Sequence, residues 1–222
     1  MKSFFLFLSA LVYASFATSS HAAPPVVISS LPFIITYPGK YVLAGDLTCP
    51  SGVNAIEIST ATPGAVVLDM AGHTITGPGS NSLAIGIGDV SGPGEPSNAY
   101  PIEIRNGTLM NFSGGVLVDI GTGNSNIVAY ASNIRLSHLT FFLDSLTGST
   151  GVSFFRVNSS TIKDCTFTDS DTGILDTHSE GGNSYVNDVF TGVAQPLNLI
   201  ADKLSGIATT IGRYEFSEPL QN

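Results

Sequence analysis

Side chains that could perform acid–base chemistry occur in three short segments, "GVLVD" (115–119), "GVSFFR" (151–156) and "SDTGILDTH" (170–178). Carboxylates can serve as general acids or bases, an arginine can hold a polar or anionic group, and a histidine titrates near neutral pH. The residues concerned are Asp119, Arg156, Asp171, Asp176 and His178. They can act together only if the chain brings the three segments side by side, so the elements that position them have to be established.

A second set of charged side chains lies in the segments "VVLDM", "PIEI" and "NIRL", whose alternating pattern is typical of strands. If these strands are neighbours, Asp69, Glu103 and Arg135 point outward in succession, and the two carboxylates lie about 5 Å apart, as in retaining glycosidases. A simpler interpretation is a charge ladder in which Arg105 and Arg135 neutralise the carboxylates on an exposed sheet. We favour the charge ladder.

The composition excludes some partners. The chain has 8 Lys and Arg against 17 Asp and Glu, a net charge of −9, and it contains no basic run. A nucleic acid is therefore not expected as a partner. The same deficit of positive charge disfavours binding of polyanionic polysaccharides without bound cations.

The first residues have the pattern of an export signal. Residues 4–17 form an apolar run behind Lys2, and Ser20 and Ala22 satisfy the small-residue rule for cleavage after Ala22. We expect residues 1–22 to be a signal peptide and the protein to be secreted or periplasmic. The run is too short for a membrane span, and no later segment predicts one.

The rest of the chain repeats itself. Five six-residue segments begin and end with a large apolar residue: "MAGHTI" (70–75), "IRNGTL" (104–109), "LSHLTF" (136–141), "IKDCTF" (162–167) and "YVNDVF" (185–190). Residues five apart cannot share one face of a straight strand, so a bend is predicted near the fourth position. The corner residues would be His73, Gly107, Leu139, Cys165 and Asp188.

A second strand motif falls between these segments, as "GVLV" (115), "GVSF" (151), "GILD" (173) and "GVAQ" (192), with "AIEI" (55) and "AIGI" (84) as relatives. Together the two motifs resemble the right-handed parallel β-helix proteins that are grouped as pectin-lyase-like. The resemblance implies an all-β fold, a single-stranded right-handed parallel β-helix of about six coils, capped at both ends. The expected organisation is N-terminal capping strands at 23–50, the β-helix at 51–196 and a C-terminal cap or tail at 197–222.

In the enzymes of this family the substrate groove runs along the sheet built from the "GI/GV" strands. The resemblance therefore implies that this face binds, and possibly processes, a polysaccharide or cell-surface glycan. Asp119, Asp176 and His178 are the candidate catalytic residues, and Arg156 and Asp171 are candidates for substrate binding. Polygalacturonases carry Asn-Thr-Asp, Gly-Asp-Asp, Gly-His-Gly and Arg-Ile-Lys motifs at such places. These standard motifs are absent here: the chain has "SDTG" (170–173) in place of the first and none of the other three. The alternative is a non-catalytic surface or adhesion module that presents loops.

Three further features carry minor hypotheses. Thr74, Thr108, Thr140 and Thr166 would form a column on another face, similar to that of ice-binding β-solenoids. Asp169 and Asp171 have the spacing of a calcium loop but lack its later ligands, so a turn is favoured and no metal or other cofactor is expected. Cys165 is expected to be a buried corner residue too far from Cys49 for a disulfide, which leaves two free thiols.

Overall fold

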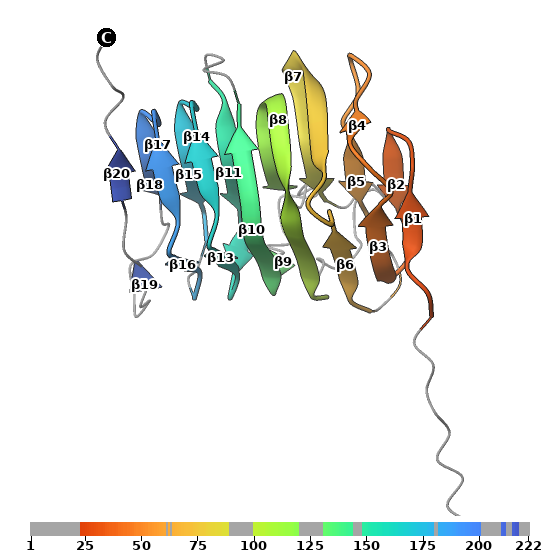
Figure 1. Cartoon of the computed structure of the whole chain (residues 1–222). Helices are drawn as coiled ribbons and strands as arrows, with labels where there is room; N and C mark the ends of the chain where they lie inside the picture. Colours follow the sequence, from red (N-terminus) through yellow and green to blue (C-terminus); the bar gives the residue numbers. More distant parts are fainter. Residues whose placement is uncertain are drawn as a thin grey trace, which may run out of the picture.

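The computed structural model describes residues 23–60, 62, 64–88, 100–119, 131–143, 148–179, 182–200, 210–211 and 215–217. These ranges form strands and contain no helix, hence none long and apolar enough to cross a membrane. The strands join in one 18-stranded sheet in which every pairing is parallel, and a separate pair is formed by β9 (Ala131–Ser132) and β12 (Val157–Asn158). Figure 1 shows the strands stacked from β1 at one end to β20 at the other. The fold is all-β and compatible with a β-helix.

Three parallel ladders make up the stack, and the long strands β7, β8 and β10 belong to more than one of them. The first ladder is β1 (Val26–Ile28), β3 (Gly39–Leu43), β6 (Val66–Asp69), β8 (Ile102–Asp119), β10 (Ile134–Phe142), β13 (Thr161–Lys163), β16 (Ser184–Val186) and β19 (Thr210–Ile211). The second ladder is β4 (Leu47–Thr48), β7 (Thr74–Ile87), β8, β10, β14 (Thr166–Thr168), β17 (Val189–Thr191) and β20 (Glu215–Ser217). The third ladder is β2 (Phe33–Ile35), β5 (Ile56–Ile58), β7, β8, β11 (Thr150–Phe155), β15 (Thr172–Thr177) and β18 (Gln195–Ile200).

The predicted bend is present, but one residue earlier than expected. Asn106, His138, Asp164 and Asn187 have left-handed backbones, with φ of 59°, 52°, 54° and 55°. Asn, Asp and His tolerate this conformation better than other residues with a Cβ atom. The residue that follows each of them points inward, so Leu139, Cys165 and Asp188 are buried.

The first of the predicted segments is out of register. Leu68, and not Met70, pairs with Ile104, so Asp69 lies opposite Arg105. The reason is a longer turn, because Ala71 and Gly72 both have positive φ and add residues before the chain re-enters the second ladder at Thr74. Met70 is still buried, and its side chain fills the space where a Cβ of Gly107 would lie.

The last segment of the second motif is also misplaced. "GVAQ" at 192 is not a strand that continues the third ladder, because Ile174 pairs with Leu197 and Thr177 pairs with Ile200. Gly192 has a φ of 64° and belongs to a corner, and β18 begins only at Gln195. The parallel pairing therefore runs past residue 196, just as β1 to β4 extend it before residue 51.

The apolar ends of the second ladder pair as predicted. Ile75, Leu109, Phe141, Phe167 and Phe190 are successive register partners, and all five are buried. The Phe141 and Phe167 rings are stacked with centroids 4.6 Å apart, and the Phe167 and Phe190 rings with centroids 4.9 Å apart. This column of five side chains belongs to the hydrophobic core.

Truncation of the middle ring tests this core. Phe167→Ala is expected to lower the free energy of unfolding by about 3–5 kcal/mol, because it leaves a cavity between two rings that cannot close it. Chemical denaturation measures the change, and Phe142→Ala, at a partly exposed position of the same sheet, is the matched control with a much smaller loss. Equal losses in the two variants would contradict the register described here.

Candidate functional site

Four side chains gather on the outer face of the third ladder, where β8, β11 and β15 lie side by side. Asp119 pairs with Phe155, and Phe155 pairs with Thr177. Arg156 places its guanidinium carbon 5.2 Å from the centre of the Phe155 ring, and the His178 ring centre lies 5.1 Å from it. We call Asp119, Phe155, Arg156 and His178 the Phe155 cluster.

The backbone explains why Arg156 and His178 take equivalent positions. Each follows the last residue of a third-ladder strand, and each has a left-handed backbone, with φ of 57° and 58°. The Arg156 N–H donates to the carbonyl of Thr177, and the His178 N–H donates to the carbonyl of Ile200, both at 3.0 Å. The turn thus holds a cation and an imidazole on neighbouring rungs, in contact with one aromatic ring.

Asp176 does not join the Phe155 cluster. In β15 the side chains alternate, so Ile174 and Asp176 point inward while Leu175 and Thr177 point outward. The Asp176 carboxylate is 8% exposed and accepts hydrogen bonds from the Asn183 amide at 2.9 Å, the Tyr185 hydroxyl at 2.5 Å and the Ser179 hydroxyl. Asp176 therefore lies apart from Asp119, because the alternation of β15 turns its side chain into the core.

Asp171 is also remote from the Phe155 cluster. It precedes β15, whereas His178 follows it, and a six-residue strand is about 20 Å long. Its carboxylate accepts the N–H of Gly148, and its own N–H donates to the Ser149 hydroxyl at 3.2 Å. Asp171 therefore stabilises a turn. In the described part of the chain no group of three His, Cys, Asp or Glu side chains could hold a metal ion.

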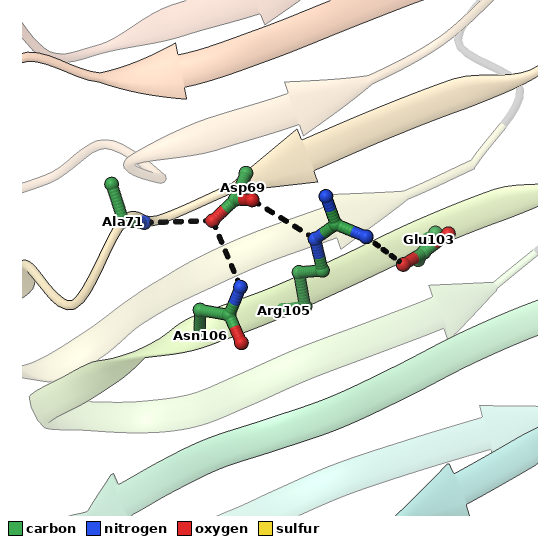
Figure 2. A network of polar contacts seen from close by, with 5 residues as sticks. All are labelled: Asp69, Ala71, Glu103, Arg105 and Asn106. Atoms are coloured by element: carbon green, nitrogen blue, oxygen red, sulfur yellow. Dashed lines mark hydrogen bonds and ion pairs between the residues drawn. The ribbon is translucent and has the colours of Figure 1, made fainter.

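The outward charges of the first ladder form a hydrogen-bonded network around Arg105 (Figure 2). Arg105 donates to Asp69 from Nε at 2.9 Å and to Glu103 at 2.7 Å, so a cation lies between the two carboxylates. The Ala71 N–H and the Asn106 amide also donate to Asp69, at 2.9 Å and 3.1 Å. Partial burial acts to raise the pKa of Asp69, but these donors outweigh it and the pKa is lowered.

This geometry removes the glycosidase-like pair considered from the sequence. Because the register places Asp69 beside Arg105, and Glu103 between Val67 and Arg135, the two carboxylates are not opposite one another. The bond to Asp69, followed by that to Glu103, raises the pKa of Arg105, so the guanidinium stays charged. The charge-ladder interpretation fits these contacts.

The threonine column is in register, with Thr74, Thr108, Thr140 and Thr166 as successive partners. In the neighbouring column, two residues later, Thr76 and Thr168 are separated by Met110 and Phe142. The array of hydroxyl groups is thus discontinuous across the middle of this face.

The corner at Cys165 holds no reactive thiol. Cys165 and Cys49 are both buried and free of disulfides, as the sequence indicates. Burial raises the pKa of Cys165 to about 12, so the nucleophilic thiolate does not form at ordinary pH. The unusual group is its neighbour Asp188, which sequence analysis placed at the same corner without a role.

Asp188 is a buried carboxyl group with half of its hydrogen-bonding capacity used. Its Oδ1 accepts the N–H of Cys165 at 2.9 Å, whereas Oδ2 has no partner among the described residues. Burial, and then the charge of Asp164, raise the pKa of Asp188 to about 7. The residue is therefore protonated in weakly acidic solution and ionised in alkaline solution.

Comparison of the chain with protein-family models, with curated proteins and with solved structures finds no match in any of the three. The evidence for the candidate site is therefore its geometry alone. That geometry keeps Asp119, Arg156 and His178 of the predicted residues near one another and adds Phe155. The signal for Phe155 was present in the sequence, as an aromatic residue at an outward position of a strand.

The raised pKa of Asp188 predicts a pH-dependent stability. An unfolded aspartate has a pKa near 3.9, so the folded chain binds the proton more tightly, and this stabilisation is complete below about pH 4. It is lost as the pH rises through about 7, and the loss amounts to about 2–4 kcal/mol. Asp188→Asn, which stays neutral, should remove this loss and exceed the wild type in stability at pH 8. Denaturation at several pH values checks this, and Asp119→Asn, a substitution of an exposed aspartate, is the matched control.

Proposed function

We propose that this protein is exported and binds a neutral polysaccharide along the outer face of the third ladder, without cleaving it. The observation that carries the proposal is the Phe155 cluster, an outward aromatic ring bracketed by Arg156 and His178. An aromatic face packs against the apolar face of a sugar ring, and flanking polar groups can bind its hydroxyl groups. The net charge of −9 favours a neutral glycan over a polyanionic one.

The neighbouring outward positions suit an extended ligand. Glu57, Gly86, Leu117, Ser153 and Leu175 are successive register partners, one column away from Asp119, Phe155 and Thr177. Strands in a sheet are about 4.8 Å apart, so a ligand laid across them meets a new side chain at each rung. A chain of sugar units can contact such a surface over several rungs.

Binding without turnover is favoured because, of the carboxylates considered from the sequence, those that the structure describes do not face Asp119. Hydrolysis of a glycosidic bond normally uses two carboxyl groups on either side of the bond. Asp176 is held in the core by three donors, Asp171 lies at the other end of its strand, and Asp69 is bound to Arg105. Asp119 and His178 alone would have to supply both the acid and the base.

The same proposal includes the finer description of the fold and its location. We propose that the chain is a right-handed, single-stranded β-helix of about six coils, related to the pectin-lyase-like proteins and capped at its ends. Three continuous parallel ladders and the recurrent left-handed corners support it. Residues 1–22, the expected signal peptide, lie outside the described residues, and secretion or export to the periplasm rests on their sequence.

Glycan binding is tested first with an array of neutral and acidic polysaccharides, followed by calorimetric titration of the best ligand. Phe155→Ala should weaken binding by at least about tenfold, because a central aromatic anchor dominates such contacts. Phe142→Ala is the matched control, since Phe142 is also a partly exposed aromatic residue but belongs to the second ladder. Chromatography of the incubated glycan should show no shortened product.

Each result has a clear consequence. Equal binding by Phe155→Ala and by the wild type would refute the site, and release of product would refute binding without turnover. If no glycan binds at all, the proposal fails, and an adhesion module that presents loops becomes the better interpretation.

A further inference from the structure

We propose that Asp176 is a positioning residue for the Phe155 cluster. Through the side chains of Ser179 and Asn183, its buried carboxyl group fixes the two turns that carry Arg156 and His178. The inference concerns the geometry of the cluster, and only its consequence for ligand affinity rests on the glycan binding proposed above.

The inward column to which Asp176 belongs is otherwise apolar. Its register partners on the neighbouring rungs are Phe154 and Leu199, and Phe154 pairs in turn with Val118. Phe154 and Val118 are fully buried, so an apolar side chain suits this column. Burial of a carboxyl group costs free energy unless hydrogen bonds replace those lost to water. The presence of Asp176 on this rung is therefore better explained by the hydrogen bonds it accepts than by filling of the core.

The Asp176 carboxyl group is the centre of a buried hydrogen-bond network. It accepts hydrogen bonds from the Ser179 hydroxyl, from the Asn183 amide at 2.9 Å and from the Tyr185 hydroxyl at 2.5 Å. All four residues of this network are buried. Because the Ser179 hydroxyl has one proton and donates it to Asp176, its oxygen is oriented to accept a further hydrogen bond.

This network holds the backbone of Val157, the residue that follows Arg156. The Val157 N–H donates to the Ser179 hydroxyl oxygen at 3.2 Å. The Val157 carbonyl accepts a hydrogen bond from the Asn183 amide at 2.7 Å. Both polar groups of the Val157 backbone are thus bound by side chains that donate to Asp176.

The two turns of the Phe155 cluster are therefore tied to each other. His178 is directly followed by Ser179, as Arg156 is by Val157, so the hydrogen bond between the two following residues joins the turns across neighbouring rungs. Both turns have the left-handed backbone that residues with a Cβ atom adopt only where surrounding contacts hold it. Fixed turns keep the guanidinium and the imidazole beside the Phe155 ring before a ligand arrives, which lowers the entropic cost of binding.

Proton NMR tests the inference without a ligand. The Phe155 ring shifts the resonances of the His178 imidazole protons, and Phe155→Ala gives their positions without that ring. Asp176→Asn should move these resonances toward their Phe155→Ala positions, because its NH₂ group cannot accept the hydrogen bonds that the carboxyl group accepts. Ser179→Ala should do the same, since it keeps the carboxyl group but removes the link to Val157. Circular dichroism with thermal melting verifies that each variant folds.

The matched control is Phe167→Ala, which weakens the core at the second ladder and should leave the His178 resonances at their wild-type positions. Unchanged resonances in both folded network variants would overturn the inference, and so would an equal displacement in Phe167→Ala.

Calorimetric titration adds the ligand. Asp176→Asn should weaken binding of the best glycan by at least about fivefold, because a displaced guanidinium or imidazole loses a hydrogen bond to the sugar. Wild-type affinity in this variant, once folded, would overturn the positioning role in binding. A wild type that binds no glycan would refute the proposed function alone, and the His178 resonances would still decide whether Asp176 positions the cluster.

Discussion

The side chains of this protein reach its interior only because each strand pairs in parallel with the same part of the next repeat. A single rung has too few residues to enclose a core, so the apolar side chains must lie directly over those of the rung below. The column of side chains from Ile75 to Phe190 is an example, because its aromatic rings are stacked at the spacing that neighbouring strands impose. A shift of a strand's register by an odd number of residues would move its inward side chains to the outer face of the sheet.

The corners protect that register. In four of the five six-residue segments an Asn, Asp or His at the third position turns the chain with a left-handed backbone, and the next residue then lies on the inner side. Buried carboxyl groups also lie close to the turns, since Asp188 and Asp176 are both buried there. The Asp176 carboxylate accepts three hydrogen bonds. The Asp188 carboxyl accepts the Cys165 N–H at Oδ1 and has no partner for Oδ2 among the described residues, and burial raises the pKa of Asp188.

The same geometry shapes the surfaces. Outward residues form straight columns, so a feature repeated on several rungs becomes an extended surface, whereas a feature on one rung stays local. Phe155, Arg156 and His178 form a local cluster on one part of the outer face of the third ladder, which suits recognition of one part of a longer ligand.

The sequence by itself determined the parallel repeat, a bend within four of the five six-residue segments to within one residue, the pairing of the aromatic core and the two free thiols. These follow from side-chain type at fixed spacing, which is a local property. The tertiary structure decided what depends on the length of each turn and on the direction of each side chain. Two extra residues at Ala71 and Gly72 moved Asp69 beside Arg105, and a corner at Gly192 displaced the last strand. The candidate site residues were separated for a similar reason. Asp119 and Asp176 are both aspartates at strand positions, but the alternation of β15 turns Asp176 into the core, whereas Asp119 is exposed to solvent.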